Sequence, residues 1–149
     1  MRVLIQRVDS AHVETEGATV GVIGRGVVLF WAAKTGDAER DVKWLADKVA
    51  GLRIFPDGAG KMNRSLLEIG GAALVVSQFT LYGDCRRGRR PSFERAMAPI
   101  EASRLYEQFC VALEIAGVRQ VERGRFQAHM LVSLINHGPV TLMLESSED

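Results

Sequence analysis

The first third of the chain shows the hydrophobic pattern of β-strands. Residues 3–8 place Val3 and Ile5 on one face of an extended segment, which predicts a strand with that face buried. Residues 11–15 and 19–23 flank a Glu-Gly pair and predict a β-hairpin. Because strands joined by such short turns pair antiparallel, we expect an antiparallel meander that continues into the apolar residues 27–33.

The spacing of apolar residues changes to three and four after Gly36, as in an amphipathic helix. Asp37 precedes this segment, and we expect it to cap the helix. A second helix is predicted between Pro99 and Gly117, because proline favours the start of a helix and glycine its end. The stripe predicted to be buried on the first helix is Ala38, Val42, Leu45, Val49 and Leu52.

The remaining apolar runs predict the rest of a sheet. They cover residues 72–81, 118–121, 127–135 and 140–144. Together with the two helices, they predict an α+β fold with a mostly antiparallel β-sheet and two principal helices. The length of 149 residues suits one domain, which we expect to span residues 1–149.

Composition and charge are those of an ordinary globular protein, with 47% hydrophobic and 25% charged residues. The formal net charge is +1, so a nucleic acid would have to be met by a local basic patch. No apolar run approaches about 18 residues and no signal-peptide pattern is visible, so we expect a cytoplasmic protein with no membrane partner. Cys85 and Cys110 are expected to be reduced. Trp31 and Trp44 are expected to lie in the core, with a position flanking the buried helix stripe as the alternative for Trp44.

Several kinds of catalytic centre are missing from the sequence. His12, His129 and His137 are scattered, and no Cys/His cluster has metal-site spacing, so we expect no metal and no cofactor. No GxSxG nucleophile elbow is present. Hydrolysis would therefore depend on backbone N–H donors, hydroxyl groups and the substrate itself.

The first candidate segment is Ser77-Gln78-Phe79-Thr80, where polar side chains enter an apolar run. One interpretation is an ordinary strand end, because Ser and Thr occur readily in strands. The other interpretation is that these groups face a ligand. The segment alone does not decide between them.

The second candidate is Gly138-Pro139, which interrupts the strand-like residues 134–144. Proline cannot donate to a sheet ladder, so it marks an edge, a bulge or a turn. A trans turn is the default, because only about one X-Pro bond in twenty is cis in folded proteins.

The third candidate is a run of arginines in residues 83–91, namely Arg86, Arg87, Arg89 and Arg90. Such a run is either a solvated loop or, with two glycines nearby, a grip for phosphates.

These segments together resemble one known family. SQFTL at 77–81 and NHGPVTL at 136–142 resemble the two signature motifs of the D-aminoacyl-tRNA deacylases. GKMNRSL at 60–66, GRRPSF at 88–93 and the N-terminal MRVLIQRV also match, so the resemblance runs nearly end to end. His137 stands where the family commonly has Asp, and we interpret it as a neutral structural replacement rather than a general base.

The resemblance implies a barrel-like fold and an ester hydrolase. Its substrates would be D-aminoacyl-tRNA and glycyl-tRNA, cleaved at the 3′-terminal adenosine, while L-aminoacyl-tRNA is spared. It further implies a homodimer with the active site at the subunit interface and a cis Gly-Pro peptide. Gly138 and Pro139 of one chain would then face residues 77–80 of the other.

The implied filter has a simple physical basis. Rigid carbonyl oxygens close to the substrate Cα leave room for a hydrogen atom but not for an L side chain. Pro139 has a fixed φ angle, and Gly138 has no Cβ to obstruct the site. Backbone N–H groups near Gln78 to Thr80 are the expected oxyanion donors. Thr80 could act as the nucleophile, but no partner base is apparent, so we favour assistance from the ribose 2′-hydroxyl.

The remaining assignments concern the tRNA. Phe126 and Met130 are candidates for contact with the adenosine, with core packing as the alternative. The arginines at 86–90 could hold acceptor-stem phosphates. Two rival functions stay open: an RNA-binding dimeric module without catalysis, and a small-ester or peptide hydrolase that uses Thr80.

Overall fold

One long strand organises the sheet in the computed structural model, which describes residues 1–146. Strand β1 (Arg2–Thr15) pairs antiparallel with β2 (Ala18–Ile23), β3 (Gly26–Ala32) and β8 (Leu131–Glu145). The strands predicted before the first turn are therefore one continuous strand. The hairpin predicted at Glu16 and Gly17 is confirmed, and both residues have positive φ angles, 52° and 76°.

The other half of the sheet is parallel, which the sequence pattern did not predict. β6 (Ala72–Ser77) pairs parallel with β3, and β7 (Val121–Arg123) pairs parallel with β6. Each connection contains a principal helix, α1 (Glu39–Gly51) or α3 (Pro99–Ile115), which returns the chain in the same direction. The α+β class with two principal helices is confirmed, and antiparallel pairs still predominate.

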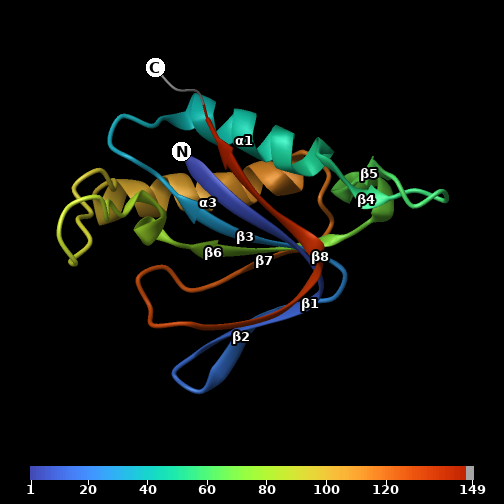
Figure 1. Cartoon of the computed structure of the whole chain (residues 1–149), viewed down its shortest axis with the longest axis horizontal. Helices are drawn as coiled ribbons and strands as arrows, with labels where there is room; N and C mark the ends of the chain where they lie inside the picture. Colours follow the sequence, from blue (N-terminus) through green and yellow to red (C-terminus); the bar gives the residue numbers. More distant parts are fainter. Residues whose placement is uncertain (147–149) are drawn as a thin grey trace.

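Both principal helices lie on one side of the sheet, which curls into a nearly closed shape on the other side (Figure 1). Successive strand residues point to opposite faces, so two separate apolar clusters form. The cluster under the helices joins β-strand residues to the predicted helix stripes and includes Val27, Leu29, Trp31, Leu45, Leu105 and Phe109. The second cluster fills the curl and includes Val13, Val28, Leu74 and Val76.

A smaller unit follows α1. β4 (Arg53–Pro56) and β5 (Met62–Ser65) form a two-stranded sheet that is followed by the short helix α2 (Leu66–Ile69). Figure 1 shows this unit at one end of the molecule, away from the loop that contains the arginine run. Ser65 caps α2, since its hydroxyl accepts from the backbone N–H of Glu68.

Two predictions about α1 are wrong. Ala38, not Asp37, occupies the N-cap position, and Asp37 instead accepts a hydrogen bond from the Lys34 N–H and pairs with the Met1 amine. Trp44 is 46% exposed, because it lies beside the buried stripe rather than within it. Trp31 lies in the core as predicted.

The boundaries of the late strands also differ from the prediction. The run predicted at 72–81 ends as a strand at Ser77, and the 3₁₀ helix η1 (Phe79–Tyr82) follows it. Residues 127–130 form a loop rather than a strand. β8 then runs through Gly138-Pro139 instead of stopping there.

Both cysteines are free thiols, as predicted. Cys85 is exposed, whereas burial raises the pKa of the Cys110 thiol to about 12. Within residues 1–146, no helix has the length and apolar character needed to cross a membrane.

Candidate active site

A cavity of about 660 Å³ opens at the carboxyl ends of the parallel strands β3 and β6. Its walls come from these strand ends, the start of η1, the first turn of α3 and the loop of residues 126–130. The carboxyl ends of parallel strands are a common location for ligand sites. We call this cavity the main pocket.

Three of the four residues in the first candidate segment line the main pocket: Ser77, Gln78 and Phe79. Ser77 pairs with Trp31 at the last position of the β3–β6 ladder. Polar side chains therefore begin where the buried strand ends and the pocket opens. The ligand-facing interpretation of this segment agrees with its position.

Of the backbone N–H groups of Gln78, Phe79 and Thr80, which were predicted as oxyanion donors, two have no acceptor in the described backbone. The Gln78 N–H already donates to the carbonyl of Trp31 at 2.7 Å. Phe79 and Thr80 begin η1, where N–H groups have no partner within the helix. No backbone hydrogen bond from either N–H occurs within residues 1–146. These two N–H groups are therefore the ones in this segment without a backbone acceptor among the described residues.

Thr80 does not line the main pocket, and it is exposed. Its hydroxyl accepts a hydrogen bond from the Gln78 side-chain amide. Within the described residues, no histidine, carboxylate or lysine contacts that hydroxyl. A threonine nucleophile normally needs such a base, so this geometry does not favour the nucleophile role.

The two residues predicted to contact adenosine line the same pocket. Phe126 also packs against Tyr106, with ring centroids 5.9 Å apart, and borders the helix-side core. Met130 borders the core cluster on the other side of the sheet. Each of the two side chains therefore packs against the core and also lines the pocket. Core packing and a position in the pocket do not exclude each other here.

The pocket also contains residues that were not named as individual contacts from the sequence, although Gln127 lies within the segment 126–130 that was expected to face the adenosine. Trp31 forms part of its wall, and the Trp31 indole N–H has no hydrogen-bond partner within the described chain. Gln127 has a φ angle of 61°, which is uncommon for a residue other than glycine. Phe93 stacks edge-to-face on Phe79 at 5.2 Å, and its place in the GRRPSF motif was the only sequence signal for it.

Gly138 and Pro139 do not line the main pocket of their own chain. Their peptide bond is cis, and both residues are exposed on β8. The segment forms a β-bulge. Gln6 pairs with Thr141 and Val8 pairs with Asn136, so β8 has more residues than β1 between the two pairs. Within one chain, the two signature motifs are thus not brought together.

Arg7 holds the bulged segment in place. This side chain is buried, and its guanidinium donates to the carbonyl of His137 at 2.9 Å and to that of Ile54 at 2.6 Å. On the other side, the Asn136 amide donates to the carbonyls of Arg7 and Val140. Side-chain hydrogen bonds thus fix the backbone just before the Gly-Pro pair and just after it.

His137 points to Asp9 rather than to the main pocket. Its Nδ1 atom lies 3.0 Å from a carboxylate oxygen of Asp9, and both side chains are partly exposed. The residue is absent from the pocket lining. His137 therefore lies outside the pocket, and its structural role stays a prediction.

The arginine run forms an exposed loop beyond the pocket. Arg86 pairs with Asp84 through two hydrogen bonds, which holds the pKa of the Asp84 carboxyl well below its usual range. Arg87, Arg89 and Arg90 are exposed, and no ion pair involves them within residues 1–146. Arg86 is therefore less available for a phosphate than was predicted.

Comparison with known proteins now adds to this geometry. The family described as D-Tyr-tRNA(Tyr) deacylase matches residues 4–145. The proteins from Solibacter usitatus and Thermotoga petrophila named D-aminoacyl-tRNA deacylase are 56% and 55% identical. Each alignment covers 99% of this chain, and 97% and 99% of the respective relative. The chain belongs to the D-Tyr-tRNA(Tyr) deacylase family.

Membership in the D-Tyr-tRNA(Tyr) deacylase family places the chain among hydrolases that act on ester bonds. Solved structures agree on the fold. One titled "c-Myc DNA Unwinding Element Binding Protein" has a TM-score of 0.93 and 33% identity, covering 99% of this chain and 100% of that chain. Another, titled as a probable eukaryotic D-amino acid tRNA deacylase, has a TM-score of 0.81 at 22% identity, covering 96% and 97%.

Proposed function

We propose that this protein hydrolyses the ester of D-aminoacyl-tRNA and releases the D-amino acid and the tRNA. The observation that carries the proposal is the main pocket, which joins residues 77–79 to Phe126 and Met130 in a member of this family. Apolar side chains there suit the adenosine. The N–H groups of Phe79, which lines the pocket, and of Thr80, the next residue along η1, suit an oxyanion.

The chemistry that we propose needs no nucleophilic side chain. Water attacks the ester carbonyl, and the ribose 2′-hydroxyl beside the ester helps to position or activate that water. The negative charge of the tetrahedral intermediate falls on the former carbonyl oxygen, which the two free N–H groups stabilise. Losing one donor of this kind typically slows an enzyme by about 100- to 1000-fold.

We further propose that Gly138 and Pro139 reject L-aminoacyl-tRNA and that glycyl-tRNA is accepted. Rigid carbonyl oxygens near the substrate Cα would exclude an L side chain, whereas glycine carries only hydrogens there. The bonds from Arg7 and Asn136 supply the rigidity that this exclusion needs. Because the pair lies outside its own pocket, the filter requires a second copy of the chain.

The surface of β8 supports a homodimer. β8 pairs only with β1, so its other edge is free within the described chain. Four large apolar side chains of β8 are exposed: Leu131, Ile135, Leu142 and Met143. A long, exposed, apolar edge strand is normally covered by another chain. We propose that a second copy covers this strand and that its main pocket faces Gly138 and Pro139.

The experiment that tests the proposed function compares three substrates with the purified protein. These are D-aminoacyl-tRNA, glycyl-tRNA and the ethyl ester of the same D-amino acid. We expect turnover of both tRNA esters and little of the ethyl ester, which lacks the ribose hydroxyl. Efficient cleavage of the ethyl ester would support the small-ester hydrolase instead. Tight tRNA binding with no turnover would support the RNA-binding module.

A further inference from the structure

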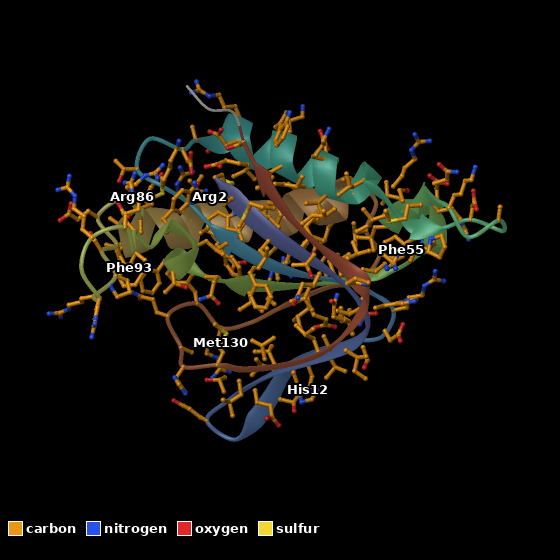
Figure 2. All side chains as sticks on the ribbon, viewed as in Figure 1. Arg2, His12, Phe55, Arg86, Phe93 and Met130 are labelled. Carbon is orange, nitrogen blue, oxygen red and sulfur yellow. The ribbon has the colours of Figure 1, made fainter. Side chains whose placement is uncertain are left out.

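A second cavity, of about 490 Å³, lies at the end of η1, and three arginines contribute to its lining. Its border includes Arg2, Tyr82, Asp84, Arg86 and Arg95. Figure 2 shows Arg2 and Arg86 on the same side of the molecule as Phe93, which lines the main pocket. We call this second cavity the arginine cavity. Arg2 and Arg95 lie outside the arginine run of the sequence.

The ring of Tyr82 brings two of these arginines together. Tyr82 is buried, and the guanidinium carbons of Arg2 and Arg95 lie 4.5 and 5.6 Å from its ring centroid. Burial raises the pKa of the Tyr82 hydroxyl, so the ring stays neutral in ordinary buffers. Cation–π attraction therefore holds two positive groups near the same ring.

The hydrogen bonds of the cavity leave one guanidinium available. Arg86 is paired with Asp84, while Arg2 donates to Glu145 at 2.8 Å and to the Leu81 carbonyl at 3.1 Å. Within residues 1–146, the Arg95 side chain makes no hydrogen bond or ion pair. Of the three arginines that line the cavity, Arg86 pairs with Asp84 and Arg2 with Glu145, so Arg95 is the one without an ion pair among the described residues.

Arg95 is held at a defined place although its side chain is exposed. Its carbonyl accepts a hydrogen bond from the Thr35 N–H at 3.1 Å, and the next residue, Ala96, bridges to Lys34. A guanidinium on an anchored backbone presents its planar donors in a restricted direction. Such a group suits the oxygen atoms of a phosphate.

The arginine cavity is coupled to the main pocket through η1. Phe79 lines the main pocket and Tyr82 lines the arginine cavity, and they are three residues apart on the same short helix. Phe93, two residues before Arg95, packs against Phe79. A polynucleotide whose terminal adenosine enters the main pocket would thus bring its nearest phosphates close to Arg95.

We propose that Arg95, supported by Arg2 and Tyr82, binds a backbone phosphate near the aminoacylated end of the tRNA. The proposal rests on the proposed function, which puts the 3′ end of the tRNA in the main pocket. Arg95 would be a phosphate contact in addition to the arginine run, and its backbone is anchored by the hydrogen bond from Thr35. Arg95 binds and positions the substrate and takes no part in the chemical step.

The test compares Arg95→Gln with Arg119→Gln as the matched control. Arg119 is also exposed, but it follows the end of α3, whereas Arg95 precedes its start, and a 17-residue helix is roughly 25 Å long. Each variant is assayed with D-aminoacyl-tRNA and with D-aminoacyl-adenosine, which has no phosphate. For Arg95→Gln, we expect the KM for the tRNA to rise about three- to tenfold, and the slope of log affinity against log salt to fall by about 1.

Turnover of D-aminoacyl-adenosine should be unchanged in both variants, and Arg119→Gln should behave as the wild type on tRNA. Arg95→Lys should restore most of the affinity, because it restores the charge. Asp84→Asn should tighten tRNA binding about threefold, since it removes an anion from the cavity. Weaker binding by Arg95→Gln and tighter binding by Asp84→Asn would show an effect of charge, because damage to the loop would weaken binding in both variants.

Two results would overturn the phosphate site. One is an equal loss of activity of Arg95→Gln on D-aminoacyl-adenosine and on the tRNA. The other is tRNA binding by Arg95→Gln that equals binding by Arg119→Gln at every salt concentration. If the wild type hydrolyses neither substrate, the proposed function fails, but binding of uncharged tRNA by the two variants still tests the phosphate site.

Discussion

At the scale of single residues, Thr80 decides between two mechanisms. Within residues 1–146, its hydroxyl is hydrogen-bonded only to the Gln78 amide, and no base is bonded to it. Thr80→Val should therefore keep kcat for D-aminoacyl-tRNA within about tenfold of the wild type, because the backbone N–H that we assign to the oxyanion is retained. Single-turnover deacylation measures this directly. A loss above about a thousandfold with unchanged tRNA binding would make Thr80 the nucleophile.

Gly138 tests the filter at the same scale. A Cβ added at this position would collide with the backbone nitrogen of Val140, so Gly138→Ala must shift the bulge. We expect the ratio of D- to L-aminoacyl-tRNA turnover to fall by at least about tenfold, since the exclusion depends on carbonyl position. Gly58→Ala, in an open turn with no atom near its Cβ position, is the matched control. An unchanged ratio in Gly138→Ala would remove the pair from the filter.

At the scale of elements, α1 shows which side of a helix carries stability. Leu45 is fully buried, whereas its neighbour Trp44 is 46% exposed. Leu45→Ala should lower the free energy of unfolding by about 2–5 kcal/mol, from lost burial and the remaining cavity. Trp44→Ala should lower it by less than about 1 kcal/mol, as for most surface changes. Urea denaturation at one protein concentration compares them, and equal losses would contradict the assignment of the buried face.

The elements also show what could be predicted from the sequence. The strands of the first hairpin and both helices follow from periodicity and turn residues, because these signals are local. The parallel pairing of β3 with β6 and β7 did not follow, since it depends on how the helix crossovers pack. Strand periodicity also failed to end β6 at Ser77, because Phe79 and Leu81 keep the run apolar while the chain turns into η1.

Some residues of the candidate site could be predicted from the sequence and others could not. Residues 77–79, Phe126 and Met130 were predicted from motifs, and the fold brings them to one pocket. Trp31 was predicted only as a core residue, because an indole that faces both a core and a pocket has no separate sequence signal. Arg95 lies just after the arginine run and far from Arg2 in the sequence, so their proximity emerges only in the fold, where both lie against Tyr82.

At the scale of the whole molecule, the proposed dimer makes β8 an interface. Ile135→Asp would place a charge in that apolar surface and should convert the dimer to a monomer, because a buried unpaired charge is costly. The ratio of D- to L-aminoacyl-tRNA deacylation should fall with it, since the filter and the pocket come from different copies. Ile115→Asp is the control, because Ile115 is 82% exposed at the end of α3. Analytical ultracentrifugation reports the assembly, and a wild-type monomer with full activity would contradict the account.

The central claim is that this pocket cleaves the tRNA ester of a D-amino acid and spares the L isomer. The most direct measurement is the rate of deacylation of one tRNA charged with D- and with L-tyrosine under single-turnover conditions. We predict hydrolysis of the D ester at least about 100-fold faster than that of the L ester, which corresponds to about 2.7 kcal/mol of discrimination. Equal rates for the two isomers would contradict the account.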